Sequence, residues 1–171
     1  MKLNKKTKLV FILIALFLIG LAVPSYSWTR KNVKEIETFY NSKLSPIIMI
    51  PGSSATENRF DGLVRKLNQD RRGTKHSLLK VKVWNNGRIT FEGKIRKNDN
   101  EPIIVIGFEN NKDGYSNIKK QSKMMNQAFE ALQNKYNFNN FKGLAHSNGG
   151  LIIFFFIRLL LKIILATTMS R

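Results

Sequence analysis

Residues 1–28 combine a basic start with a long apolar run. Residues 1–8 are polar and carry four lysines, and residues 9–23 form an apolar stretch without a charge, followed by small residues at Ser25 and Ser27. This order is typical of a secretory signal that is cleaved after Ser27. The run is shorter than the roughly 20 residues that a spanning helix prefers, but it also fits an uncleaved anchor with its lysines kept inside. We therefore expect residues 1–28 to be either a signal peptide or an N-terminal membrane anchor.

Two continuous apolar runs further along the chain predict buried strands. Residues 46–50 end at the breaker Pro51-Gly52, and residues 102–108 form the second run. Strands that are apolar on both faces are typical of parallel sheets with a layer of helices on each side. A third, shorter strand is expected over residues 141–145, after an Asn-rich turn at residues 137–140.

Period-two alternation predicts a hairpin between these runs. Residues 79–84 alternate between apolar and polar side chains, and the sequence Asn85-Asn86-Gly87 favours a tight turn into a return strand over residues 89–91. The hairpin is expected to be an inserted or edge element of the sheet.

Apolar residues at helical spacing predict two amphipathic helices. One covers residues 57–68 behind Thr56 as its N-cap, and a longer one covers residues 116–136. Strands that alternate with helices indicate an α/β fold with a mostly parallel, doubly wound sheet. We expect residues 29–45 to form a lead-in or stalk and residues 46–171 to form a partial domain of this class.

The charge of the chain changes the list of expected partners. Its 171 residues carry 29 Lys and Arg against 11 Asp and Glu, a formal net charge of +18. This excess favours contact with anionic surfaces such as phospholipid headgroups or anionic envelope polymers. The cations are spread along the chain without an aromatic-interleaved basic run, so we expect no nucleic-acid partner. The chain has no cysteine, which excludes disulfides, thiolate metal sites and a cysteine nucleophile.

The sequence Ala145-His146-Ser147-Asn148-Gly149-Gly150 lies between a predicted strand and an apolar segment. A nucleophile elbow needs small residues two positions before and two positions after its serine, because the flanking backbones approach closely there. Ala145 and Gly149 meet this requirement, so we expect Ser147 to be a nucleophile. We expect the backbone N–H groups of Asn148 and Ser53 to form the oxyanion hole, Asn148 at a helix start and Ser53 in the loop after the first strand.

These motifs resemble those of the Gram-positive cell-surface α/β-hydrolases, a family with a domain of unknown function. The resemblance covers residues 46–151. It is carried by the opening that ends Ser-Ala-Thr-Glu-Asn-Arg-Phe, the Val-Trp-Asn-Asn-Gly-Arg-Ile-Thr-Phe-Glu-Gly hairpin, the Ile-Gly-Phe-Glu-Asn-Asn strand end and the Ala-His-Ser-Asn-Gly-Gly elbow. It implies a lipase- or esterase-like serine hydrolase outside the cytoplasm, with Ser147, Ser53 and Asn148 in the roles given above. The sequence contains no metal-binding cluster and no phosphate-binding Gly loop, so we expect no cofactor or metal.

The rest of a catalytic triad is missing from the sequence. Hydrolases of this fold supply Ser, then Asp or Glu, then His along the chain, but no Asp, Glu or His follows Ser147. His146 is expected to point away from the nucleophile and to pack beneath the elbow, and His76 is expected at the surface. The tail over residues 151–171 is apolar nearly all round, which favours a truncation after a shift of reading frame or, alternatively, a second membrane-seeking segment.

A small membrane protein that uses both apolar ends remains possible on the sequence, beside two functions from different classes. One is an exported or anchored serine hydrolase of unknown ester or acyl substrate, inactive as written because the triad acid and His are absent. The other is a non-catalytic basic envelope protein that binds an anionic polymer or lipid.

Overall fold

The computed structural model describes residues 4–39, 41–70 and 72–169. It consists of two compact units, Met1–Asn41 and Ser42–Arg171. Among the described residues, the first unit holds one helix, and the second holds a five-stranded sheet with three helices. The two units are described separately below.

The first unit is the 35-residue helix α1, Lys5–Phe39. It continues through Pro24, where the hydroxyl of Ser25 donates a hydrogen bond to the carbonyl of Leu21 at 2.8 Å. Its stretch Thr7–Lys31 is long and apolar enough to cross a membrane. This candidate span is longer than the apolar run in the sequence because the helix does not end at the proline. By length and composition a signal sequence passes the same test, so both interpretations of residues 1–28 stand.

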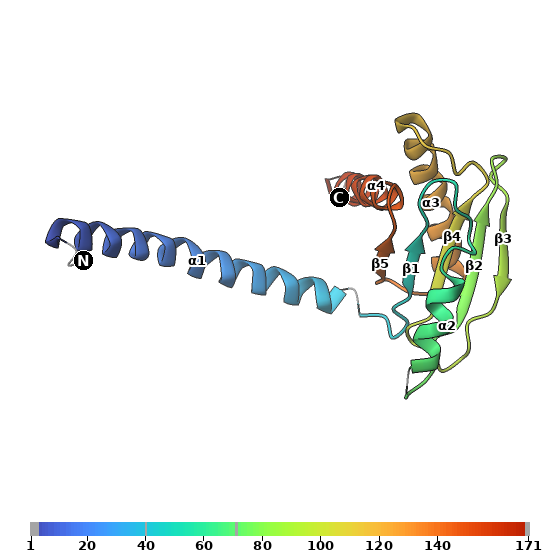
Figure 1. Ribbon diagram of the computed structural model, residues 1–171, viewed down its shortest axis with the longest axis horizontal. Helices are drawn as coiled ribbons and strands as arrows, with labels where there is room; N and C mark the ends of the chain where they lie inside the picture. Colours follow the sequence, from blue (N-terminus) through green and yellow to red (C-terminus); the bar gives the residue numbers. More distant parts are fainter. Residues whose placement is uncertain (1–3, 40, 71, 170–171) are drawn as a thin grey trace. The chain divides into compact units, whose positions relative to one another are not determined.

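The second unit is built on a mixed sheet with the strand order β3-β2-β4-β1-β5 (Figure 1). Strands β2, β4, β1 and β5 are parallel, and β3 is antiparallel at the edge. The hairpin is therefore an edge element and the sheet is mostly parallel, which confirms the predicted fold class. The strand bounds are β1 Ile47–Ile50, β2 Leu78–Val83, β3 Ile89–Gly93, β4 Ile103–Phe108 and β5 Lys142–Ala145.

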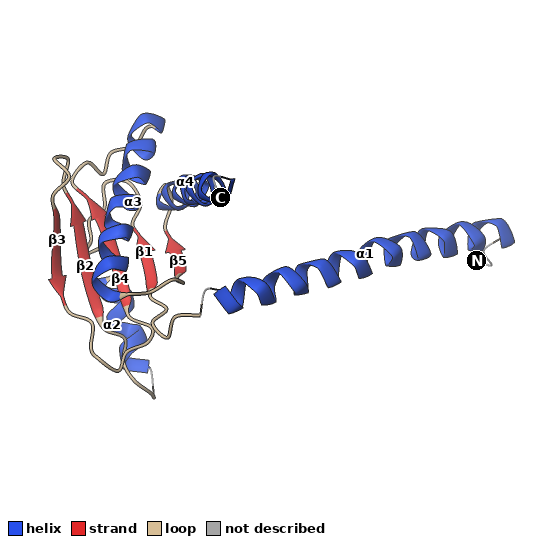
Figure 2. Cartoon of the chain, turned by 180° about the vertical axis from the view of Figure 1, so that it is seen from behind, coloured by secondary structure: helices blue, strands red, loops and turns tan. Residues whose placement is uncertain are grey.

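Helices cover both faces of the sheet, as the views from opposite sides show (Figures 1 and 2). Helices α3 (Tyr115–Tyr136) and α4 (Gly149–Met169) pack on one face around the larger apolar core. Helix α2 (Asp61–Asp70) packs on the other face, where Phe60 and Val64 are buried against alternate residues of β1 and β4. This two-sided cover explains why all six residues of β4 are buried.

The predicted start of α2 was wrong. The helix begins at Asp61, and residues 57–60 form turns instead. The hydroxyl of Thr56 accepts a hydrogen bond from the N–H of Asn58 at 3.3 Å, so Thr56 stabilises a local turn rather than capping the helix.

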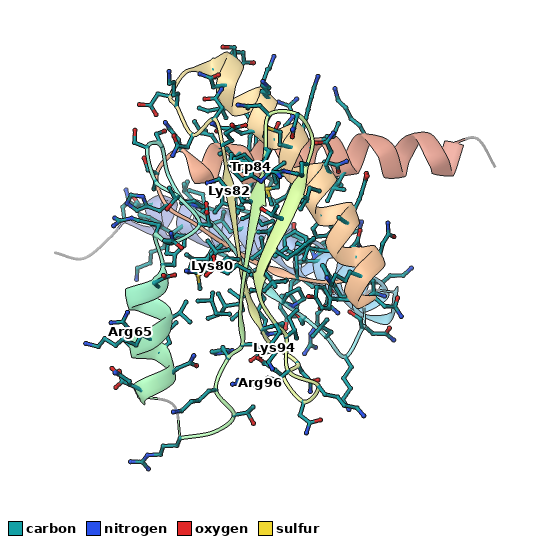
Figure 3. The ribbon with its side chains drawn as sticks, turned by 90° about the vertical axis from the view of Figure 1, so that its right-hand side faces the viewer. Arg65, Lys80, Lys82, Trp84, Lys94 and Arg96 are labelled. Atoms are coloured by element: carbon teal, nitrogen blue, oxygen red, sulfur yellow. The ribbon has the colours of Figure 1, made fainter. Side chains whose placement is uncertain are left out.

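The outward side of β2 carries Lys80 and Lys82, and Trp84 follows directly after the strand (Figure 3). Lys80 pairs with Asp61 at 2.8 Å and Lys82 with Glu57 at 3.5 Å. The Lys82 ammonium also lies 4.9 Å from the centre of the Trp84 ring. Carboxylates from the α2 side of the molecule therefore balance the charge of these two lysines.

Candidate active site

Ser147 lies in the tight turn between β5 and α4, three connecting residues in all. Its φ is +52°, in the left-handed region that a residue with a side chain rarely adopts. The side chain is exposed, and its hydroxyl makes no hydrogen bond to any residue that the structure describes. A strained, exposed serine between a parallel strand and a helix has the geometry of a nucleophile elbow.

Close backbone contacts explain why the residues beside Ser147 are small. A Cβ on Gly149 would lie 2.5 Å from the carbonyl oxygen of Ile50 and 2.8 Å from that of Pro51. On the strand side, Ala145 pairs with Ile50 in the β1–β5 register. The first turn of α4 therefore lies against the carboxyl end of β1, and position 149 has no room for a side chain.

The loop after β1 lies directly against the elbow. A Cβ on Gly52 would lie 3.0 Å from both the Ser147 Cβ and the His146 carbonyl oxygen. The backbone N–H groups of the next residue, Ser53, and of Asn148 donate no hydrogen bond within the described part of the chain. Two unused N–H groups beside an exposed serine can stabilise an oxyanion, and the Asn148 group also lies at the positive end of α4.

The Asn148 side chain ties the elbow to two other loops. Its Nδ2 donates to the Ser53 Oγ at 2.8 Å and to the Asp113 Oδ1 at 2.7 Å. The loop after β4 adds a second link, because the N–H of Ser54 donates to the Asn111 carbonyl at 2.8 Å. The structure therefore brings together all three predicted site residues and adds Asp113, which the sequence motifs did not indicate. The topology of the sheet could have indicated Asp113, because β4 neighbours β1 and the carboxyl ends of parallel strands meet at one edge of the sheet.

Both histidines differ from expectation. His146 is exposed, and its Nδ1 lies 3.0 Å from the Cβ position of Gly52, so the ring is beside the loop after β1 rather than beneath the elbow. The residues of β5 are exposed, although Ile153 of α4 lies near Gly143 of this strand. His76 is buried, not at the surface, because its Nδ1 pairs with the Glu101 carbonyl at 2.5 Å and Asn68 holds its backbone.

An open hollow of about 550 Å³ lies beside the candidate site, lined by Ser53, Ser54, Ala55, Thr56, Asn58, Arg59 and His146. It adjoins Ser53 and His146, on the side of the elbow where the loop after β1 lies. Among the described residues no group of three His, Asp or Glu side chains is placed to hold a metal ion.

Residues 34–160 match the family described as an α/β hydrolase of unknown function (DUF915). The match extends ten residues into the tail for which the sequence pattern favoured a shifted reading frame or, alternatively, a second membrane-seeking segment. No curated protein matches the chain.

Two solved structures are similar to the second unit. One, described as a cell surface hydrolase from Lactobacillus plantarum WCFS1, is 52% identical with a TM-score of 0.62. It is matched over 67% of this chain and 46% of its own. The other, a gene product from Listeria innocua, is 34% identical with a TM-score of 0.60, over 66% of this chain and 43% of its own. The chain thus spans less than half the length of these relatives. The elbow, the mixed sheet and the family match together show that this chain belongs to the DUF915 family of α/β hydrolases.

Proposed function

We propose that Ser147 is the nucleophile of a serine ester hydrolase, with the backbone N–H groups of Ser53 and Asn148 as its oxyanion hole. The observation that carries this proposal is the left-handed, exposed Ser147 between β5 and α4, with the loop after β1 packed against it. In the reaction the Ser147 Oγ forms a bond to the ester carbonyl carbon, and its proton passes to a base. The carbonyl oxygen becomes an oxyanion between the two N–H groups, and the alkoxide leaves with a proton to give an acyl-serine.

The base is the component that these residues do not supply. The sequence contains only His76 and His146. His76 is buried against Glu101, and His146 makes no hydrogen bond to the Ser147 hydroxyl among the described residues. A serine without a base is a weak nucleophile, so we propose that the chain as written does not turn over esters at an enzymatic rate. An intact oxyanion hole alone still accelerates acyl transfer by about 10³-fold over water.

We also propose that the hydrolase acts outside the cytoplasm. The apolar stretch of α1 supports export or anchoring, and the solved relative from Lactobacillus plantarum is described as a cell surface protein. Whether α1 is cleaved distinguishes a secreted protein from an anchored one. The mass of the mature chain recovered from an expressing bacterium decides between them.

A serine-directed fluorophosphonate probe tests the nucleophile. We expect labelling that maps to Ser147, about 10³-fold faster than labelling of the exposed Ser116. Ser147→Ala should abolish this labelling. The matched control is Ser54→Gly, which removes a neighbouring hydroxyl and accepts the same left-handed backbone, φ +59° at Ser54. It should label like the parent chain.

The same measurement separates the second candidate function. A non-catalytic basic envelope protein would be labelled at Ser147 no faster than at Ser116. Equal rates at the two serines, or unchanged labelling of Ser147→Ala, would overturn the hydrolase proposal.

A further inference from the structure

The second unit has a groove between helices α3 and α4, away from Ser147. Its volume is about 580 Å³. None of the candidate site residues lines it. We call it the cationic groove, and its lining residues are Tyr115, Ser116, Lys119, Lys120, Ser122, Lys123, Phe155, Arg158, Leu159 and Lys162.

Five of these residues are cations and none is a carboxylate. Lys119 and Lys123 are four residues apart on α3, and Arg158 and Lys162 are four residues apart on α4, so each pair lies on one helix face. Like charges at this spacing destabilise a helix, and here two such pairs line one hollow. A bound anion would remove this repulsion.

The charges of the cationic groove are not balanced by the protein itself. None of its five cations forms an ion pair with a described carboxylate. The lysines of β2 in Figure 3 differ, because Lys80 and Lys82 are paired with Asp61 and Glu57. In addition, α3 begins at the groove without an acidic residue in its first turn and without a side-chain cap. The positive end of a 22-residue helix therefore adds to the charge.

The same groove has an apolar part. The rings of Tyr115 and Phe155 meet edge to face with their centres 5.8 Å apart, and the half-buried Leu159 lies beside them. The Lys119 ammonium lies 4.4 Å from the centre of the Tyr115 ring. Cations around an apolar lining match a ligand that has an anionic head and an apolar body.

We propose that the cationic groove binds the phosphate headgroups of anionic phospholipids at a bilayer surface. Clusters of lysine and arginine bind such headgroups, and a basic pocket between two helices has the required concave form. The aliphatic glycerol region of the lipid fits against Tyr115, Phe155 and Leu159. A nucleic acid would need an extended basic track, which a local hollow between two helices does not provide. The ligand proposed for the groove thus differs from the ester substrate proposed for Ser147.

The test uses the full-length chain in vesicles of phosphatidylcholine and in vesicles of equimolar phosphatidylcholine and phosphatidylglycerol. Because the chain has no cysteine, Ser116→Cys gives a single attachment point for an environment-sensitive fluorophore at the rim of the groove. The apolar helix α1 is present in both kinds of vesicle, so the comparison isolates the effect of lipid charge. We expect a spectral shift with phosphatidylglycerol and none without it.

Matched variants assign this shift to the groove. Each lost cation should weaken headgroup binding about fivefold, so the triple variant Lys119→Gln, Lys123→Gln, Arg158→Gln should show no shift. The control Lys66→Gln, Arg72→Gln, Lys94→Gln removes the same charge from exposed positions elsewhere and should keep the shift. The pair Lys119→Arg, Lys123→Arg preserves charge and should keep it as well.

Four outcomes would overturn the proposal. The first is the absence of a spectral shift in the parent chain, and the second is an equal shift in the groove triple variant and its parent. The third is an equal shift from a probe at Thr90→Cys on β3, and the fourth is a full shift in phosphatidylcholine vesicles on adding inorganic phosphate at constant ionic strength. The third indicates general adsorption, and it decides the question even if the triple variant does not fold. The fourth indicates a free-anion site rather than a bilayer contact.

Discussion

Gly149 and Gly150 are adjacent in the chain but have opposite surroundings. A Cβ on Gly149 would meet two backbone carbonyl oxygens within 3 Å, whereas nothing lies within 4 Å of the same position on Gly150. A backbone atom cannot move aside as a flexible side chain can. Position 149 therefore has to be glycine because α4 packs closely against β1 there. Gly150 has no such role.

This contrast predicts opposite effects of one substitution. Gly149→Ala should lower the free energy of unfolding by about 1–3 kcal/mol, because the methyl group forces α4 away from β1. Gly150→Ala should leave it unchanged or raise it by about 0.5–1 kcal/mol, since alanine is the better helix former. Urea unfolding of the two full-length variants measures both. Equal stability of the two variants would contradict the close contact at position 149.

At the same scale, the residue pattern indicated part of the candidate site. The spacing of small residues around a serine points to the turn that holds Ser147 and Asn148, because this spacing follows from local backbone geometry. Asp113 could not be found in this way. Its hydrogen bond to Asn148 joins residues 35 positions apart, and only the parallel register of the sheet brings them together. The same holds for His76, whose burial depends on contacts with Asn68 and Glu101.

Among the elements, those with a strong period or a continuous apolar run were predicted closely. Helix α3 differs from the expected residues 116–136 by one residue, and all five strands were anticipated. A boundary set by a single residue was wrong, as Thr56 illustrates. A threonine can stabilise a turn instead of a helix start.

Helix α4 shows how burial divides an apolar segment. Phe156 is fully buried, 5.1 Å from the Phe129 ring centre, whereas Phe154 is 54% exposed. Phe156→Ala should lower the free energy of unfolding by about 3–5 kcal/mol through the cavity it leaves. Phe154→Ala should change it by less than about 0.5 kcal/mol. Thermal or urea unfolding gives both values, and a large loss in Phe154→Ala would contradict the packing of α4.

On the scale of the whole molecule, the chain corresponds to part of a larger α/β hydrolase and contains the proposed nucleophile Ser147. Its family match runs from residue 34 to residue 160, and it spans less than half of each solved relative. The charge excess that the composition revealed is unevenly balanced in three dimensions. The lysines of β2 are paired with carboxylates, whereas the cations of the cationic groove are paired with none that the structure describes. This difference depends on which helices pack together, so the number of lysines in the sequence does not reveal it.

The sheet itself has a gradient of protection. Strand β4 lies between β2 and β1 with every residue buried, whereas β5 pairs only with β1 and has every residue exposed. We expect the amide hydrogens of β5 to exchange with deuterium about a hundredfold faster than those of β4. Hydrogen exchange followed by mass spectrometry on the full-length chain measures this. Equal protection of the two strands would contradict the gradient.

The exposure of β5 has a consequence for the elbow it supports. Ser147 follows β5 directly, so each local opening of that strand also releases the left-handed turn. The opening equilibrium of this four-residue strand then affects the fraction of time for which Ser147, the proposed nucleophile, is aligned with the proposed oxyanion donors of Ser53 and Asn148. The fraction of molecules with Ser147 in the left-handed turn therefore depends on the stability of β5 at the sheet edge. Any contact that stabilises β5 raises this fraction.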